Sequence, residues 1–400
     1  MKNIVSRVAV DFIYSLTGFV VMNAVLQFAL YPQLKSQLGA DYFGQILYVI
    51  SILSIFSISF GSAADNSRLI LRKETPTSNG DYNLSILIFS VVSIGFSYPL
   101  LLWVTPEENM WLVELLLVLT LLRYYSGVQF RMNLDYRGYL FYYLSISTGY
   151  IVGLALFLLG ANWIIAFLIG ELFAFVYVLI FGEIYRGPYF VLSNFIRCFT
   201  SISQLSLANL LNNSVQNLDR VLLIFLIGAV ANSQYYIVSL LGKTLALIIV
   251  PVNSIMIGYL TKGKQIIHFA DFLKLLSAIF FIGVFALLGC IYFTPIFLNF
   301  FYPGMLSGVQ DFIFLASLGQ IFCFTSSILL TILMTMASEK WQIGIQTIYV
   351  LVFLILTVEL SLRNGLMGFV WGVMLANLIR FIIVLGINSI IILRKENCRV

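Results

Sequence analysis

The chain has 400 residues, of which 61% are hydrophobic and only 10% are charged. Because soluble domains carry about 25% charged residues, this composition excludes a soluble globular protein and indicates a polytopic membrane protein. The four cysteines and the single histidine, His268, are scattered without the spacing of metal or redox motifs. The residues therefore predict no metal site, no bound cofactor and no catalytic dyad.

Twelve apolar runs are long enough to cross a bilayer, which requires about 20 consecutive helical residues. They predict an all-α fold of about twelve transmembrane helices. The first run is too long for a signal peptide and has no cleavage site behind it, so it is expected to remain as the first span. The expected spans are 9–31, 43–63, 83–104, 111–130, 139–160, 163–182, 200–227, 235–258, 273–294, 310–333, 342–360 and 367–391.

Positive charges set the expected orientation of these spans. With the amino terminus in the cytoplasm, sixteen Lys and Arg residues fall on cytoplasmic segments and only two, Lys35 and Arg363, fall outside. This bias places both termini in the cytoplasm. It also accounts for the net charge of +5, so no nucleic-acid partner is expected. The outer loops are short, which disfavours an enzyme that polymerises or transfers sugars.

A weak internal repeat divides the chain. A shift of 189 residues aligns six identical residues in a window of 27, and one of the aligned pairs is Gly39 with Gly228. Because the shift spans six helices, both halves would enter the membrane in the same direction, as in parallel repeats. The expected organisation is two pseudo-symmetric six-helix bundles, 1–182 and 200–400, joined by a cytoplasmic amphipathic linker, 183–199.

The seventh span is unusual because amides and a charged pair lie along its middle. On a helix of 3.6 residues per turn, the four residues Asn209, Asn213, Gln216 and Arg220 share one narrow stripe. Polar groups that face lipid are costly, so the stripe is expected to line a bundle interior or a water-filled path and to contact substrate. The alternative is interhelical hydrogen bonding that holds a bundle together.

Basic residues remain inside other spans after the loops are assigned. We expect Arg123, Lys243 and Arg380, together with Arg220, to make a cavity between the two bundles cationic and to bind an anionic headgroup. Arginine suits phosphate because its planar fork donates two hydrogen bonds at once. The alternative is that these bases form structural ion pairs with acids inside the spans. The candidate acids are Glu114, Glu171 and Asp219.

Three acids inside the spans, Asp11, Glu171 and Asp219, are candidates for coupling to an ion gradient. One elementary charge that moves through 100 mV is worth about 2.3 kcal/mol, which is enough to bias a conformational cycle. The residues do not identify the ion, so a proton gradient and a sodium gradient both stay open. For Asp11, the alternative is a position at the membrane interface.

Two short motifs resemble those of a known family. Pro32-Gln33-Leu34, followed by Leu38-Gly39 and Phe43-Gly44, resembles the P-x-L…LG…FG pattern of Wzx-type bacterial polysaccharide flippases. The motif that is similar to the start of that family's second half consists of Asp219-Arg220, Ile227-Gly228 and Tyr235-Tyr236. The family belongs to the multidrug/oligosaccharidyl-lipid/polysaccharide exporter superfamily.

The resemblance implies a flippase rather than an enzyme. Its substrate would be an undecaprenyl-pyrophosphate-linked oligosaccharide repeat unit, carried from the cytoplasmic to the outer leaflet by alternating access for O-antigen, lipopolysaccharide or capsule biosynthesis. It also implies a location in the bacterial inner membrane, with a polysaccharide polymerase and a chain-length regulator as further partners. A scaffold role in a polysaccharide assembly complex could coexist with transport.

Two other functions stay open. One is a drug or cation antiporter of the same superfamily, which the prominent intramembrane bases disfavour. The other is a membrane glycosyltransferase or polysaccharide polymerase. The short outer loops and the lack of a paired-acid motif in any loop disfavour this second alternative.

Overall fold

The computed structural model describes residues 2–72, 76–187, 191–244, 269–336 and 339–397. Within this part of the chain every regular element is helical, which confirms the all-α class. Contacts divide the chain into two compact units, Met1–Val221 and Leu222–Val400. The division by contacts does not test the predicted bundles 1–182 and 200–400 or the linker 183–199 between them, so these stay predictions.

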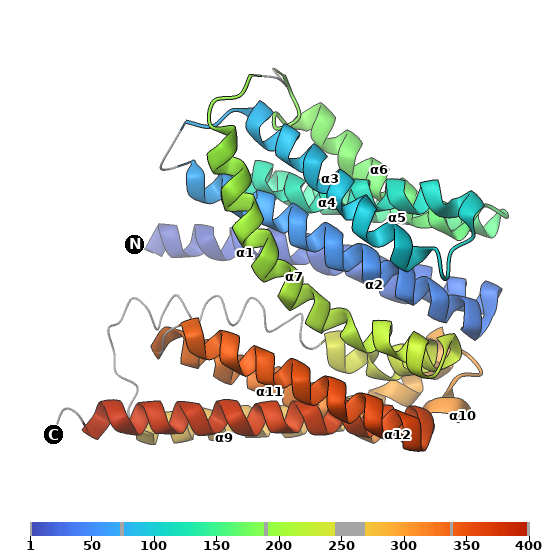
Figure 1. The fold of residues 1–400 in the computed structure, drawn as a ribbon, viewed down its shortest axis with the longest axis vertical. Coiled ribbons are helices and arrows are strands. Elements are labelled where there is room, and N and C mark those ends of the chain that lie inside the picture. The colour runs from blue at the N-terminus through green and yellow to red at the C-terminus, as the bar shows by residue number, and fades with distance from the viewer. Residues whose placement is uncertain (1, 73–75, 188–190, 245–268, 337–338, 398–400) are drawn as a thin grey trace. The chain divides into compact units, whose positions relative to one another are not determined.

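The first unit is a bundle of long helices (Figure 1). Polar side chains fix several helix starts: Ser78 and Asp81 form a capping box on α3, while Asp135 and Asn162 cap α5 and α6. The elements are α1 (Lys2–Ala24), the π-helical turn η1 (Val25–Leu30), α2 (Tyr31–Leu71), α3 (Asn79–Leu101), α4 (Glu107–Asn133), α5 (Tyr136–Leu158), α6 (Trp163–Phe181) and α7 (Phe195–Leu226).

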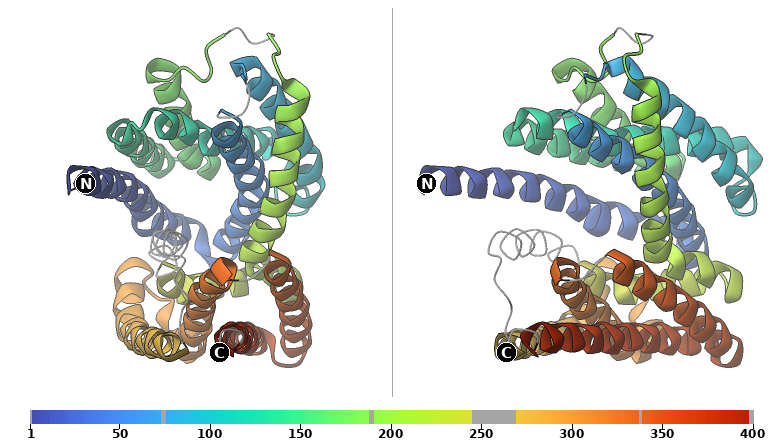
Figure 2. Two further views of the ribbon diagram at one scale, coloured as in Figure 1. Left: turned by 90° about the vertical axis from the view of Figure 1, so that its left-hand side faces the viewer. Right: turned by 60° about the vertical axis from the view of Figure 1, so that its left-hand side comes forward.

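The helices α1 and α2 pack on different partners, α1 on α5 and α2 on α4. Figure 2 shows the two blue helices running in different directions. The π-helical turn η1 joins them without leaving the helical region, because the flanking residues Ala24 and Tyr31 both have right-handed helical angles. The break in the backbone comes later, at Gly39, where φ is 82° and ψ is 171°. The segment 32–42, between the first two expected spans, is thus helical except at Gly39, and α2 continues to Leu71 rather than ending at 63.

Two glycines with positive φ occupy equivalent positions in the internal repeat. Gly39 interrupts α2 with φ 82° and ψ 171°. Gly228 has φ 120° and separates α7 from the helical residues 229–244. Residues with a Cβ rarely adopt such angles, so glycine is favoured at both positions. These are the glycines that the 189-residue shift aligns, so the repeat extends to backbone conformation.

The described part of the linker is bonded to the start of α3. The fully buried carboxylate of Asp81 accepts hydrogen bonds from the backbone N–H groups of Ser193, at 2.9 Å, and Asn194, at 3.2 Å. The side-chain amide of Asn79 donates to the carbonyl oxygen of Arg186 at 3.0 Å. These bonds attach the residues just before α7 to the first unit.

The second unit consists of helices with an apolar core and an apolar exterior. Phe272 on α9, Leu329 on α11 and Val384 on α12 pack together in its core. Aromatic side chains such as Phe285 and Tyr292 on α9 are exposed, as expected for a surface in lipid. Beyond the helical residues 229–244, the elements are α9 (Phe269–Phe301), α10 (Leu306–Val309), η2 (Gln310–Phe312), α11 (Ile313–Met336) and α12 (Glu339–Asn397), which is interrupted at Asn364 and Gly365.

Eight segments among the described residues are long and apolar enough to cross a membrane. Two of them, Ile13–Leu71 and Gly344–Arg394, each extend over two predicted spans. The seventh predicted span corresponds to α7, whose amides and charged pair lower its hydropathy. The eighth, 235–258, lies partly outside the described residues. The chain is a multi-pass membrane protein.

Candidate functional site

A buried ion pair joins α4 to α6 in the first unit. The Nε atom of Arg123 donates to both carboxylate oxygens of Glu171, at 2.7 and 3.0 Å. Tyr150 on α5 donates its hydroxyl to the same carboxylate at 2.8 Å. The charged side chains are 10% and 4% exposed, so the pair is almost fully removed from solvent. The structure thus brings together Arg123, which the sequence predicts to contact substrate, and Glu171, which it predicts to couple transport to an ion gradient.

Arg123 has further partners. Its guanidinium lies 4.3 Å from the ring centroid of Tyr124, and its Nη1 atom lies 3.9 Å from the Sδ atom of Met22. Tyr142 donates its hydroxyl to the Arg123 carbonyl oxygen at 3.0 Å. The bond from Tyr150 to the Glu171 carboxylate is the kind that helps a buried ion pair to offset its desolvation. The ion-pair alternative therefore describes this conformation, while substrate contact by Arg123 and ion coupling by Glu171 stay predictions.

Small residues allow α5 and α6 to approach closely beside this network. A Cβ added at Gly149 would lie 2.8 Å from the Cα of Gly170, and one at Gly153 would lie 2.4 Å from the carbonyl oxygen of Ala166. Close approach at glycine is a common way for membrane helices to pack. The approach brings Tyr150, on the same helix, within hydrogen-bonding distance of Glu171 on α6.

The polar stripe of α7 divides into two parts. The buried amide of Asn213 donates to the hydroxyl of Ser59 on α2 at 3.0 Å, and Asn209 donates to the Ser59 carbonyl oxygen at 3.2 Å. These two amides form interhelical hydrogen bonds, as the alternative expected. Gln216 is exposed, and so is Asn212, four residues before it. Residues at this spacing lie on one helix face, so Asn212, which flanks the stripe, forms one accessible surface with Gln216.

The charged pair follows the stripe toward the end of α7. Asp219 is 7% exposed, and its Oδ1 atom accepts a hydrogen bond from the backbone N–H of Arg220 at 2.9 Å. Arg220 is half-buried. Adjacent residues on a helix point about 100° apart, so the two side chains extend in different directions. Substrate contact by Arg220 and ion coupling by Asp219 stay predictions.

Arg380 on α12 lies in a polar cluster of the second unit. Its guanidinium is 4.9 Å from the ring centroid of Tyr349, and its Nη1 atom is 3.8 Å from the Sγ atom of Cys323. The Tyr349 hydroxyl donates to Asn377 Oδ1 at 3.0 Å, which holds the ring. Among the described residues, the buried Nε atom of Arg380 has no hydrogen-bond partner. The guanidinium thus retains donor capacity for a ligand.

Lys243 lies beside a tyrosine of the second motif. Its Nζ atom is 5.6 Å from the ring centroid of Tyr235, a distance at which a cation is attracted to the ring. Gln320 donates to the Tyr235 hydroxyl at 3.4 Å, and Phe369 packs edge-on against the same ring, with centroids 5.3 Å apart. The motif residue therefore supplies a fixed aromatic surface for the lysine.

The three candidate coupling acids have separate surroundings. Glu171 belongs to the ion pair, and Asp219 lies on α7. Asp11, on α1, is half-buried and lines a groove with residues of the α4–α5 turn. Among the described residues, no group of three or more His, Cys, Asp or Glu side chains could hold a metal ion.

Sequence reasoning missed a buried arginine near the end of α2. Arg68 falls in the cytoplasmic segment expected between the spans 43–63 and 83–104, but it is only 9% exposed and donates to the Tyr125 hydroxyl and the side-chain oxygen of Asn79. Its guanidinium also lies 4.9 Å from the ring centroid of Tyr82. Asp65, one turn earlier, forms an ion pair with Arg131 on α4. The helical spacing of Asp65 and Arg68 is the sequence signal that α2 extends beyond its predicted end.

A second buried acid has a single local partner. Glu114 on α4 is 8% exposed, and both of its carboxylate oxygens lie 3.2 Å from the hydroxyl of Ser97 on α3. Among the described residues it forms no ion pair. Glu114 therefore does not neutralise the bases named above.

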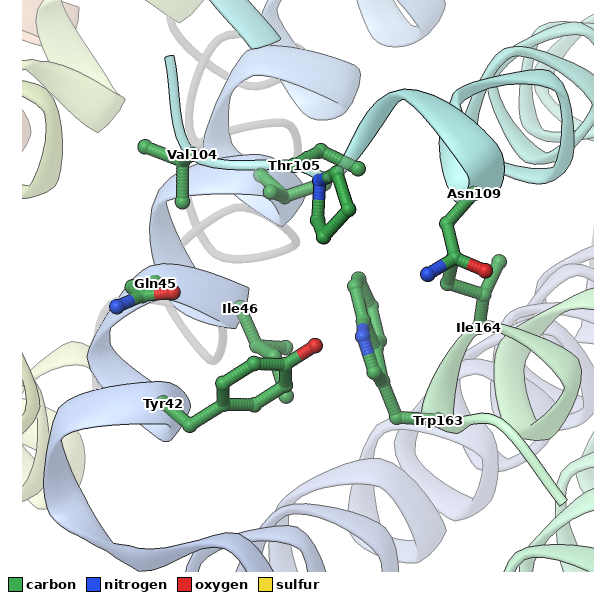
Figure 3. Close-up of a pocket in the computed structure, with 10 residues that line it drawn as sticks. Tyr42, Gln45, Ile46, Val104, Thr105, Asn109, Trp163 and Ile164 are labelled. Carbon is green, nitrogen blue, oxygen red and sulfur yellow. The ribbon is translucent and has the colours of Figure 1, made fainter. Parts of the chain in front are cut away.

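A pocket in the first unit is too small for a sugar. Figure 3 shows Trp163 and Tyr42 beside Asn109 and Thr105, which together line a cavity of about 10 Å³. Asn162 donates to Asn109 at 3.0 Å. Within the described residues, the buried hydroxyl of Thr105 has no partner. A volume of roughly 10–15 Å³ is needed for one water molecule, so the pocket can hold about one.

No family model and no curated protein sequence match this chain. Solved structures match its fold. The lipid II flippase MurJ, in an inward closed conformation, has a TM-score of 0.71 and 18% identity over 94% of this chain and 87% of its own. An inward-facing multidrug resistance MATE family transporter of the MOP superfamily has a TM-score of 0.62 and 14% identity, with 97% and 98% of the two chains covered. The Vibrio cholerae MATE transporter VcmN, in its bent form, has a TM-score of 0.60 and 13% identity, with 99% and 98% covered.

These similarities concern the whole length of the chain. They show that it shares the fold of these proteins, with about twelve transmembrane helices in two bundles, which confirms the predicted fold class. The similar structures are transporters and a flippase rather than enzymes.

Proposed function

We propose that this chain is a flippase that moves undecaprenyl-pyrophosphate-linked oligosaccharide repeat units from the cytoplasmic to the outer leaflet by alternating access. The fold shared with a lipid II flippase over 94% of the chain supports a flippase. The two short motifs that resemble Wzx-type flippases support the polysaccharide pathway. The protein performs no covalent chemistry in this proposal.

The exposed part of the α7 stripe carries the proposal. Asn212 and Gln216 are exposed amides near the middle of a helix of 32 residues. Amide groups donate and accept hydrogen bonds, as sugar hydroxyls do, so they can replace the water around an oligosaccharide. Asn209 and Asn213 hold this helix on α2, which fixes the face that the other two amides present. The interhelical bonds and the ligand-binding face thus use different members of one stripe.

The second unit supplies donors for the diphosphate in this proposal. Arg380 lies against Tyr349 and, among the described residues, contacts no carboxylate. Its planar guanidinium can donate two hydrogen bonds to phosphate, which a lysine cannot do in the same geometry. Lys243, also of the second unit, and Arg220, of the first unit, are the other proposed contacts. Arg123 is assigned a weaker part, because Glu171 already occupies its Nε atom.

A drug or cation antiporter is the second candidate, because the MATE transporters share the fold. Such an antiporter needs an available carboxylate for its cargo. Glu171 accepts hydrogen bonds from Arg123 and Tyr150, so in this conformation its charge is compensated. This compensation counts against Glu171 as the cation site, which leaves Glu114, bonded to Ser97, as the acid that an antiporter would use.

The flippase proposal also includes the cellular location of the protein, its protein partners and the ion gradient that drives transport. We place the protein in the bacterial inner membrane, with both termini in the cytoplasm, acting with a polysaccharide polymerase and a chain-length regulator. A proton or sodium gradient would drive the cycle through Asp11, Glu171 or Asp219. Transport that is unchanged when both gradients are collapsed would remove this part of the proposal.

The test is a transport assay in liposomes that contain the purified full chain. A labelled undecaprenyl-pyrophosphate-linked oligosaccharide is added, and its transfer between leaflets is followed by protection from a membrane-impermeant quencher. We expect Gln216→Leu and Arg380→Lys each to lower the transfer rate about tenfold, which corresponds to about 1.4 kcal/mol. Cationic dyes serve as the alternative cargo in the same liposomes.

Arg363→Gln is the matched control, because Arg363 is exposed and its ion pair is with Glu359, one turn earlier on the same helix. We expect this variant to transport at the original rate. Transfer of the dye but not of the lipid would replace the flippase proposal with the antiporter. Unchanged lipid transfer in both Gln216→Leu and Arg380→Lys would remove these two residues from the proposed site.

A further inference from the structure

We propose that a groove between α1 and the α4–α5 turn binds the headgroup of a zwitterionic phospholipid that carries an ammonium and a phosphate. The groove encloses about 390 Å³, which falls within the roughly 300–1,000 Å³ of small-molecule sites. Its charged lining residues are Asp11, Asp135 and Arg137. This inference is independent of the transported substrate.

The groove is built by a tight helix-to-helix turn. Leu134 ends α4 with φ 53°, and the N–H of Asp135 returns to the carbonyl oxygen of Phe130 at 3.0 Å. The Oδ1 atom of Asp135 then caps α5 by accepting from the N–H of Gly138 at 2.9 Å. A left-handed residue with a Cβ is unfavourable and occurs mostly where the surrounding structure or a function requires it. The turn fixes Asp135 at one wall of the groove.

Opposite charges line the groove. Among the described residues, neither Asp11 nor Arg137 forms an ion pair, although both line the same cavity. Arg137 instead lies 5.8 Å from the ring centroid of Tyr14 on α1. A ligand that carries both charges can satisfy both walls, with its ammonium at the carboxylates and its phosphate at the guanidinium.

The balance of charge selects the class of lipid. Two carboxylates and one guanidinium line the groove, so an anionic headgroup would meet a net repulsion. A primary ammonium can donate hydrogen bonds to Asp11 and Asp135, whereas a trimethylated ammonium has no N–H to donate. The groove therefore matches phosphoethanolamine better than phosphocholine.

The position and rim of the groove suit a membrane lipid. It lies where α4 ends and α5 begins, and both helices are long and apolar enough to cross the bilayer. The headgroup region of the membrane is expected at such helix ends. Two apolar residues that line the groove, Val10 and Leu134, are 44% and 64% exposed. Ile13, one turn after Val10 on α1, is 57% exposed. These side chains offer an apolar surface to the acyl chains.

The test is native mass spectrometry of the purified full chain in detergent. Phosphatidylethanolamine, phosphatidylcholine and phosphatidylglycerol with the same acyl chains are added separately at equal concentration. We expect phosphatidylethanolamine to be retained about tenfold more than either of the others. The preference should be lost in Asp11→Asn and in Arg137→Gln, and kept in Arg137→Lys, which retains the charge.

Arg363→Gln again serves as the control, since it removes an exposed charge on a helix of the other unit. A variant that does not purify as a monodisperse protein is replaced by Tyr14→Leu, which removes the ring beside Arg137 and should weaken binding. Equal retention of the three lipids, preferential retention of phosphatidylglycerol, or an unchanged preference in Arg137→Gln would each overturn the proposal.

Discussion

Arg123 on α4 and Glu171 on α6 form a buried ion pair with a bifurcated hydrogen bond, in which the Nε atom of Arg123 lies 2.7 and 3.0 Å from the two carboxylate oxygens. The pair ties together two helices of the first unit, and Tyr150 adds a third. The residues occupy predicted spans, where an isolated charge would be costly. Because the two opposite charges neutralise each other, both residues can lie inside membrane spans.

The first prediction concerns this pair. Glu171→Gln leaves the guanidinium of Arg123 buried without its counter-charge, so we expect a loss of stability of about 3–5 kcal/mol. The measurement is thermal unfolding of the purified protein in detergent. The double variant Arg123→Met with Glu171→Leu should recover most of this loss, because it removes both charges. A stable Glu171→Gln protein that has lost only gradient-driven transport would instead support the ion-coupling role.

The second prediction separates the two parts of the α7 stripe. Asn213→Leu removes the hydrogen bond to Ser59 and should destabilise the protein by about 0.6–2 kcal/mol, the range for bonds between membrane helices. Gln216→Leu should leave the unfolding temperature unchanged, because Gln216 is exposed. Both are measured by thermal unfolding. A larger loss of stability in Gln216→Leu than in Asn213→Leu would contradict this division.

The third prediction concerns attachment of the linker. Asp81→Ala removes the acceptor for Ser193 and Asn194, and the loss of a hydrogen bond to a buried charged group costs about 1–3 kcal/mol. We expect trypsin to cleave after the exposed Arg186 about tenfold faster, because local opening of the linker becomes easier. Asp271→Ala, which removes an exposed acid on α9, is the control. Equal cleavage rates in both variants would argue against the attachment.

The fourth prediction concerns the interruption of α2. Gly39→Ala forces a Cβ into an angle range that is almost confined to glycine, so we expect a loss of about 1–3 kcal/mol even though no atom lies within 4 Å of the added carbon. Gly95→Ala in α3 also meets open space, but its backbone is helical. That substitution should be neutral or stabilise by about 1 kcal/mol. Comparable unfolding temperatures for the two variants would show that α2 can straighten at Gly39.

The all-α class and the positions of most membrane-spanning helices could be predicted from the sequence, because the length of an apolar run indicates whether it can cross a bilayer. The errors occur where helix continues outside the hydrocarbon region. Segment 32–42 and the end of α2 carry polar residues, yet they are helical. Hydropathy measures partition into lipid and not hydrogen bonding of the backbone, so it cannot find the end of such a helix.

The sequence could predict which polar residues share one face of α7, but it could not predict which residues they contact. Helical spacing alone put Asn209, Asn213 and Gln216 on one stripe. It could not assign Asn213 to Ser59 and leave Gln216 exposed, because that depends on how α7 packs on α2. The burial of Arg68 was missed for the same reason, since its partners come from α3 and α4.

The sequence by itself determined that the chain is a multi-pass helical protein with charges and amides inside its spans, because these properties follow from local composition and spacing. It also determined the repeat, which aligns Gly39 with Gly228. Only the tertiary structure decided that Arg123 meets Glu171 and that Asp11 and Arg137 line one groove. The residues brought together are 48 and 126 positions apart, and a distance across a bundle is set by packing rather than by position along the chain.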